Sequence, residues 1–301
     1  MRRISLLCVT VILSTMFVCA ALGQEPVVQK PCAHTVVGDL QIVPFASKIF
    51  QNTRMLRVWL PPGYSDEASQ GRRYPVLYML DGQNLFDACT AFNGKDEWRI
   101  DETLTRLIAE DKVPPMIVVG IDNGGAQRAY EYLPYADKLQ NPSMPEPDGK
   151  MFPDFLGKEI IPYVEAHYRT QPGVMNRALG GSSYGGVATL YTLITRPDLF
   201  QLGIVESPIL SVGNAQLLRD TSVLAEGPAK VFLGFGGRES ENPAIEDGMI
   251  KLVRMLETNL HNIATRPADV MMVIDPTGHH NEQAWAKRFP EAIQFLFGER
   301  Q

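Results

Sequence analysis

The residues best suited to covalent chemistry stand in a glycine-rich segment near the middle of the chain. Gly181-Ser182-Ser183-Tyr184-Gly185 fits the pattern G-x-S-x-G of a nucleophile elbow, in which small residues allow a strained turn between a strand and a helix. The pattern predicts Ser183 as the nucleophile, while Ser182 is expected to point elsewhere. Glycine-rich turns of this kind also serve packing or phosphate binding, so the interpretation requires catalytic partners.

A serine hydroxyl needs a general base, which is usually a histidine. The sequence places His279 and His280 in a loop between an apolar run, Val270–Ile274, and a helical pattern that begins near Glu282. A histidine in such a loop would face the carboxyl end of the sheet, above the elbow. Spacing alone does not decide which of the two histidines is the general base. The other three, at positions 34, 167 and 261, lie near the amino terminus or on helical segments, where solvation or packing is expected.

The third member of a triad would be an acid between the serine and the histidine in chain order. Glu239 follows the apolar run Lys230–Phe235 and the glycine turn Gly236-Gly237, and we predict that it orients the imidazole. Glu241 and Asp247 are nearby alternatives. Glu206, directly after the run Leu202–Val205, is a further acid at the same edge, as a second choice or a substrate contact.

The oxyanion of an acyl-transfer reaction needs hydrogen-bond donors, commonly the amide after the nucleophile and one amide from the loop after the third strand. These criteria point to the backbone amides of Tyr184 and Gln83. Asp81 and Gly82 precede Gln83, and Gly82 permits a tight turn there. We expect Asp81 and Gly82 to contact the substrate, although a purely structural turn would have the same sequence.

The elements that must position these residues alternate between strands and helices. Continuous apolar runs at Tyr74–Leu80 and Met116–Ile121 are typical of central parallel strands covered on both faces. Further strands are predicted at residues 40–43, 55–60, 177–180, 202–205, 230–235 and 270–274, and helices near 100–108, 155–167, 185–196, 244–260 and 282–297. The order predicts an α/β fold with a mostly parallel central sheet, helices on both faces, and ligands at the carboxyl ends of the strands.

One long irregular stretch, from about Asn123 to Met151, is rich in proline and tyrosine. Loops of this length are usually functional or mobile, so we expect residues 133–151 to form a cap on the substrate side. Trp98 and Tyr132, with Tyr130 and Tyr135, could stack on an aromatic or sugar group, and core packing is the simpler role for each.

The amino terminus has the pattern of a signal peptide. Arg2 and Arg3 precede an apolar run, Ile4–Ala21, and small residues follow before Gln24. We therefore expect residues 1–23 to be removed and residues 24–301 to form one catalytic domain, secreted or periplasmic. An uncleaved signal anchor is the alternative. No other stretch is apolar enough to span a bilayer.

The composition of the chain limits the classes of partner and cofactor that we expect. Without residues 1–23 the chain has 26 Lys and Arg against 34 Asp and Glu, a net charge of −8. This charge argues against nucleic acid and anionic lipid and favours a small or neutral substrate. Cys32 and Cys89 remain as an even pair, and a structural disulfide between them is as plausible as two free thiols. No zinc, dinucleotide or P-loop motif is present, and we expect neither metal nor cofactor.

The segments described above together resemble the esterase D and enterochelin-esterase-like family of α/β-hydrolases. The similarity rests on Tyr74–Asp87, Pro115–Asn123, Arg128 with Glu131-Tyr132, Gly181–Gly186 and Gly278–Trp285. In this family the histidine directly precedes an Asn-Glu pair, which selects His280, and the acid lies in a glycine turn, which matches Glu239. The resemblance implies an α/β-hydrolase fold and hydrolysis of a small-molecule ester through Ser183.

Two departures leave the substrate open. Glu206 precedes Ser207-Pro208 where relatives usually have a small residue, and residues 133–151 match no substrate-specific pattern. A siderophore, a feruloyl or acetyl sugar and a short-chain ester all remain candidates. Acyl transfer to an alcohol is the alternative reaction, and a non-catalytic binding protein of the same fold is the alternative function. The oligomeric state is not predicted.

Overall fold

The computed structural model describes residues 32–139 and 141–298. The predicted signal peptide, residues 1–23, lies outside the described residues. The strands are β1 (Asp39–Ala46), β2 (Thr53–Leu60), β3 (Val76–Leu80), β4 (Ile117–Ile121), β5 (Arg177–Ser182), β6 (Leu202–Glu206), β7 (Lys230–Gly236) and β8 (Asp269–Asp275). The α-helices are α1 (Ile100–Ala109), α2 (Arg128–Tyr132), α3 (Phe152–Phe155), α4 (Ile161–His167), α5 (Tyr184–Thr195), α6 (Val212–Thr221), α7 (Pro243–His261) and α8 (Glu282–Phe297).

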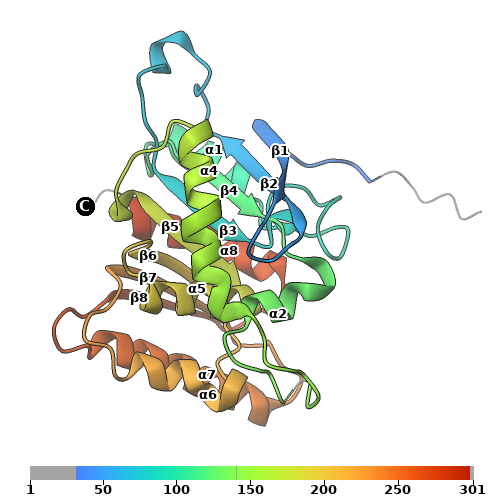
Figure 1. Ribbon diagram of the computed structural model, residues 1–301, viewed down its shortest axis with the longest axis vertical. Helices are drawn as coiled ribbons and strands as arrows, with labels where there is room; N and C mark the ends of the chain where they lie inside the picture. The colour runs from blue at the N-terminus through green and yellow to red at the C-terminus, as the bar shows by residue number, and fades with distance from the viewer. Residues whose placement is uncertain (1–31, 140, 299–301) are drawn as a thin grey trace, which may run out of the picture. The chain divides into compact units, whose positions relative to one another are not determined.

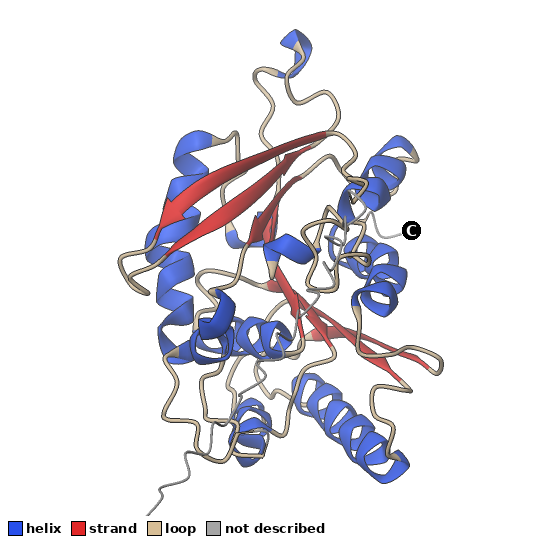
Figure 2. Ribbon diagram, turned by 90° about the vertical axis from the view of Figure 1, so that its right-hand side faces the viewer, coloured by secondary structure: helices blue, strands red, loops and turns tan. Residues whose placement is uncertain are grey.

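The eight strands form one sheet in the order β1-β2-β4-β3-β5-β6-β7-β8. Strand β2 is antiparallel to β1 and to β4, and the strands from β4 to β8 are parallel to one another. Figure 2 shows this sheet, strongly twisted, with helices on both faces. The predicted α/β fold with a mostly parallel sheet is therefore confirmed.

Two hydrophobic cores lie on opposite faces of the sheet, because neighbouring side chains of a strand point to opposite sides. In β3, Val76 and Tyr78 belong to one core and Leu77 and Met79 to the other. The core of Leu77 and Met79 is covered by α1 and α8, and the other by α4, α5, α6 and α7. In Figure 1, α5 crosses in front of the sheet and α8 lies behind it.

The helix predicted at 155–167 is longer than expected, since α3, the π-helical turn η5 (Leu156–Ile160) and α4 follow one another directly. Two helices were not predicted. Helix α2 lies within the stretch that was expected to be irregular, and residues 213–215 in the first turn of α6 are in the left-handed region. A five-residue helix and one whose first turn contains Gly213-Asn214 carry little hydrophobic periodicity to detect.

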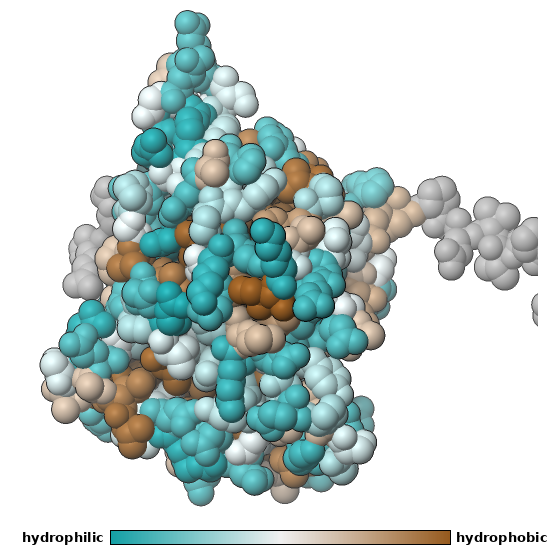
Figure 3. All heavy atoms as spheres, viewed as in Figure 1, coloured by the Kyte–Doolittle hydropathy of each residue, from teal (hydrophilic) through white to brown (hydrophobic). Residues whose placement is uncertain are grey.

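The surface seen from the side of Figure 1 is mostly hydrophilic, with small separate hydrophobic patches (Figure 3). No helix among the described residues is both long and apolar enough to span a membrane.

Candidate active site

Ser183 lies at the junction of β5 and α5, with φ 58° and ψ −124°. A positive φ is strained for a residue with a side chain and persists only where the surroundings enforce it. Here the Ser183 amide donates to the Glu206 carbonyl at 3.0 Å. Gly181 is needed because a Cβ atom there would lie 2.8 Å from the Gly185 carbonyl carbon. The turn has the geometry expected of a nucleophile elbow.

His280 and Glu239 come together from loops that are far apart in sequence. Glu239 follows β7 and His280 follows β8, and parallel pairing of these strands places both loops at one edge of the sheet. The Nδ1 atom of His280 lies 2.9 Å from Oε2 of Glu239, whose side chain is fully buried. The other oxygen, Oε1, accepts from the Gly236 amide at 2.6 Å. The carboxylate is therefore held in one orientation against the imidazole.

The alternative residues for these positions are not brought to the same place. His279 is exposed, and its carbonyl accepts from the Asn281 amide at 3.0 Å. Glu241 and Asp247 are also exposed. His280 with Glu239 is thus the pair that the structure assembles from the candidates considered.

Ser183 and His280 line one cavity of about 290 Å³ at the carboxyl end of the sheet. Its wall consists of Asp81, Gln83, Asn84, Phe92, Asn123, Arg128, Ser182, Ser183, His280, Glu282 and Trp285. Most of these side chains are polar. Ser182, which was expected to point elsewhere, is among these residues and is 4% exposed.

The two predicted oxyanion donors occupy suitable elements. Gln83 lies on the cavity wall in the 3-10 turn η2 (Gly82–Asn84), and Tyr184 starts α5, where backbone amides have no partner within the helix. Gly82 does not line the cavity. A Cβ atom there would lie 2.6 Å from the Gly120 carbonyl carbon, so Gly82 lets η2 pack directly against β4.

Asp81 lines the cavity with its carboxylate already paired. Arg128 donates to both carboxylate oxygens, from Nε at 2.7 Å and Nη2 at 2.8 Å, and Asn123 Nδ2 donates at 2.7 Å. Burial alone would lower the pKa of Arg128, but the Asp81 carboxylate outweighs it and raises that pKa. Asp81 is 4% exposed, so Arg128 is the more available member of the pair for a ligand.

Three residues expected to contact the substrate are instead buried behind the wall. Trp98 packs on Trp285, with ring centroids 5.7 Å apart, and the Tyr132 hydroxyl accepts from the Asp81 amide at 3.2 Å. Glu206 is fully buried and paired with Arg288 at 2.7 Å. None of the three lines the cavity. Trp98 packs against other aromatic rings, while Tyr132 and Glu206 find polar partners in the interior.

Glu206 is nevertheless electrostatically unusual. Burial raises the pKa of its carboxyl to about 7, and Arg288 lowers it only in part. Glu282, which lines the cavity, also has a raised pKa through burial. Two carboxyls that resist ionisation therefore lie around the site.

Sequence reasoning assigned no role to several residues of the cavity wall. Asn123, Arg128, Glu282 and Trp285 stand in segments that carry the family resemblance, so that similarity was the available signal. Phe92 had none. Its side chain is 91% exposed while lining the cavity, an unusual position for a large apolar group.

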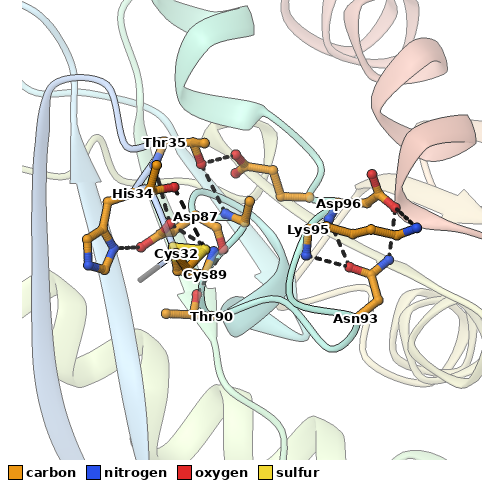
Figure 4. The surroundings of a disulfide bond; sticks show 12 residues. Cys32, His34, Thr35, Asp87, Cys89, Thr90, Asn93, Lys95 and Asp96 are labelled. Atoms are coloured by element: carbon orange, nitrogen blue, oxygen red, sulfur yellow. Dashed lines mark hydrogen bonds and ion pairs between the residues drawn. A yellow bond between two sulfur atoms is a disulfide. The ribbon is translucent and has the colours of Figure 1, made fainter. Parts of the chain in front are cut away.

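The loop that carries Phe92 is fastened at both ends. Cys32 and Cys89 form a disulfide with a Cα–Cα distance of 5.5 Å, and Asp87 beside it accepts from the His34 ring and the Thr35 amide (Figure 4). The Phe92 amide donates to Asn84 Oδ1 at 3.0 Å. The bridge, which the sequence left open, thus holds one wall of the cavity.

Thr90 links this loop to the predicted oxyanion donor. Its hydroxyl donates to the Gln83 carbonyl at 2.7 Å, and the Asn123 amide donates to Gln83 Oε1 at 3.3 Å. Gln83 is therefore held both at its backbone carbonyl and at its side chain.

Two groups of side chains within the described residues lie close enough together to share a metal ion. The first is His34, Asp87 and Cys89, in which the cysteine is engaged in the disulfide. The second is Glu97, Asp101 and Glu102, in which Asp101 accepts from the Val37 amide at 2.6 Å. Neither group lines the cavity. Their contacts fasten the segment before β1.

The predicted cap, residues 133–151, is anchored on α5 and α6. Tyr184 donates its hydroxyl to Asp137 at 2.7 Å, and Tyr135 donates to Asp220 at 2.6 Å. None of the cap's described residues lines the cavity. A role in covering substrate stays a prediction.

The chain is similar in sequence to several known proteins. The chain is 23% identical over 258 residues to the uncharacterized protein YbbA of Bacillus subtilis, covering 81% of this chain and 93% of that one. It is 29% identical over 182 residues to the apo-salmochelin esterase of Escherichia coli, covering 57% of this chain and 52% of the relative. The chain thus spans about half the length of that enzyme.

Among solved structures, the fold is similar to that of an IroE-like serine hydrolase from Shewanella oneidensis. The TM-score is 0.67 at 24% identity, over 86% of this chain and 80% of that chain. The family model described as "Putative esterase" matches residues 47–296. The match covers every strand but β1 and all the cavity residues, and the chain therefore belongs to this esterase family.

Proposed function

We propose that this protein is a serine carboxylic-ester hydrolase with Ser183 as nucleophile, His280 as general base and Glu239 as the residue that orients the base. The observation that carries the proposal is the 2.9 Å contact between His280 Nδ1 and Glu239, with His280 and Ser183 on the wall of one cavity. In this arrangement Nε2 of the imidazole is left to accept the serine proton.

The reaction would proceed through an acyl-enzyme. His280 takes the hydroxyl proton as Ser183 attacks the ester carbonyl, and the amides of Tyr184 and Gln83 donate to the oxyanion. The imidazolium then returns the proton to the alcohol that leaves. Water repeats the sequence on the acyl-enzyme and regenerates Ser183. No step requires a metal or an organic cofactor.

For the substrate we propose a small siderophore ester, with sugar-linked and short-chain esters as the other candidates. The polar residues on the cavity wall and the esterase function of the named relative, an apo-salmochelin esterase, support this class. Arg128 is positioned to donate to a carbonyl or an acidic hydroxyl of such a ligand, since two of its nitrogens are held by Asp81 and its side chain is 27% exposed.

We further propose that residues 1–23 direct the protein to a secreted or periplasmic location. The Cys32–Cys89 bridge supports this location, because disulfides persist in oxidising compartments. Amino-terminal sequencing of the protein from its native compartment tests it. An intact Met1 on the mature protein would contradict cleavage after residue 23 and favour the uncleaved signal anchor.

The decisive experiment is hydrolysis of p-nitrophenyl esters by the wild type and by Ser183→Ala and His280→Ala. We expect both variants to lose at least about 10³-fold in kcat, as is usual when one triad member is removed. His279→Ala is the matched control, because that neighbouring ring is exposed, and it should remain active. Activity retained by Ser183→Ala would exclude the proposed nucleophile.

A further inference from the structure

Ser207 occupies a strained, sealed position directly after β6. Its φ is 44°, in the left-handed region, and it is 0% exposed. Its amide donates to the Gly234 carbonyl at 2.8 Å, so the backbone is fixed to β7. A serine hydroxyl without access to water must find its partners within the protein.

The Ser207 hydroxyl has two such partners, and together they determine where its proton points. Trp285 Nε1 lies 2.9 Å from the oxygen, and Oε1 of Glu239 is in short hydrogen-bond contact with it. An indole nitrogen can only donate. Ser207 therefore accepts from Trp285 and donates its own proton to Glu239.

These contacts close a ring around the catalytic pair. Glu239 uses Oε1 for Ser207 and Oε2 for His280, while the His280 ring meets Trp285 edge to face, with centroids 5.2 Å apart. Trp285 thus touches the imidazole directly and the carboxylate through Ser207. Its own ring packs on Trp98, which fixes the indole in the core of α1 and α8.

We propose that Ser207, oriented by Trp285, is a positioning residue that holds the Glu239 carboxylate and sets the pH at which His280 becomes a competent base. The proposal rests on the proposed function, since it concerns the same pair. A hydrogen bond to a carboxylate stabilises its charged form and weakens its pull on a neighbouring imidazolium. Without the Ser207 hydroxyl, Glu239 would attract protonated His280 more strongly. Its carboxylate would also be held less firmly in one orientation.

Other ionisable groups face the pair and remain in place when Ser207 changes. Glu206 lies at the end of β6, Arg288 on α8 pairs with it, and Glu282 begins α8. Glu206 interacts electrostatically with both Glu239 and His280, and Glu282 with His280. These groups shift the pH profile in the wild type and in the variants alike, so the comparison isolates the hydroxyl.

The test uses Ser207→Ala and Ser207→Gly in the full chain. Both remove the hydroxyl, and glycine accepts the left-handed backbone without strain. We expect kcat to fall roughly ten- to a hundredfold with KM nearly unchanged, and the acid limb of the kcat/KM profile to move up by about 0.5–1 pH unit. Trp285→Phe should move it in the same direction by less. Ser222→Ala is the control, because that hydroxyl is exposed and caps α6 by donating to Arg219.

The low-field proton resonance of His280 Nδ1 provides a readout that does not require turnover. Its position reports the hydrogen bond to Glu239, and we expect it to change in both Ser207 variants. An unchanged resonance and an unchanged acid limb would overturn the positioning role, even if the rate fell. A wild type without esterase activity would overturn the proposed function instead, and the resonance would still decide the role of Ser207.

Discussion

The cavity has two walls that are built by different means. Ser183 and His280 stand at the ends of parallel strands, with Glu239 behind them, and the register of the sheet fixes their spacing. Phe92, which also lines the cavity, stands instead on a loop held by side-chain hydrogen bonds and by the disulfide. The strand-end wall suits chemistry, which needs fixed geometry, and the loop wall suits recognition. Changes in the first should therefore affect kcat, and changes in the second KM or stability.

The strongest challenge to this comparison is Glu239→Gln, which preserves the shape of the strand-end wall and removes the charge. We expect kcat to fall by roughly 10³–10⁴-fold with KM little changed, as for an amide in place of a triad carboxylate. Steady-state kinetics measures both values. The exposed Glu241→Gln is the control. A loss confined to KM would mean that Glu239 serves binding and that the two walls are not distinct.

The disulfide tests the loop wall. Replacement of both Cys32 and Cys89 by Ser should lower the free energy of unfolding by roughly 2–4 kcal/mol, because the unfolded chain is no longer closed into a loop. We expect KM to rise more than kcat falls, since Ser183 and His280 stay on the sheet. Denaturation and kinetics check the two effects, and reduction of the wild type should reproduce them. A fall in kcat with KM unchanged would contradict the distinction between the two walls.

The buried pair behind the strand-end wall predicts a pH dependence of stability. Burial raises the pKa of Glu206 from 4.5 to about 7, so the folded state holds the proton more tightly than the unfolded chain. Its contribution is therefore complete below about pH 4.5 and is lost as the pH rises through 7. The loss is on the order of 3 kcal/mol.

Glu206→Gln cannot titrate at this position, so its free energy of unfolding should fall less than that of the wild type between pH 4.5 and 7. Chemical denaturation at several pH values measures the difference. The exposed Glu291→Gln should follow the wild type. Parallel curves for Glu206→Gln and the wild type would show that Glu206 ionises normally.

The smallest effect is expected at the rim of the loop wall. Phe92→Ala should leave stability and kcat unchanged, because the side chain is 91% exposed. It should raise KM for esters with a bulky apolar group by about three- to tenfold, since substrate would cover the ring. Val223→Ala, another exposed apolar residue, is the matched control. If KM is equal for bulky and small esters, Phe92 does not contact substrate.

Much of the fold could be predicted because its signals are local. All eight strands are continuous apolar or alternating runs, and an apolar run needs only its own residues to favour a buried strand. The elbow around Ser183 is local as well, since its glycines are required within five residues. The choice of His280 over His279 was not local and came from the family resemblance; the structure agrees with it because His280 is the ring that reaches Glu239.

Other residues named as substrate contacts lie in the interior, because side chains of their types have two possible destinations. Trp98, Tyr132 and Glu206 are suited in type to a binding site, and all three are buried in the interior. Whether an aromatic ring faces a ligand or the core depends on which helix covers it, and here α8 supplies Trp285 to cover Trp98. Phe92 lies at the cavity for the converse reason, because nothing among the described residues covers it.

The sequence by itself determined the order of strands and helices, the strained turn at Ser183 and the chemical types available at the carboxyl edge. Only the tertiary structure decided which of those groups meet. Ser207 and Trp285 are 78 residues apart, Glu206 and Arg288 82, and Glu239 and His280 41. Contacts over such distances depend on the register of the sheet and the packing of α8 against it, and no periodicity within one segment encodes them.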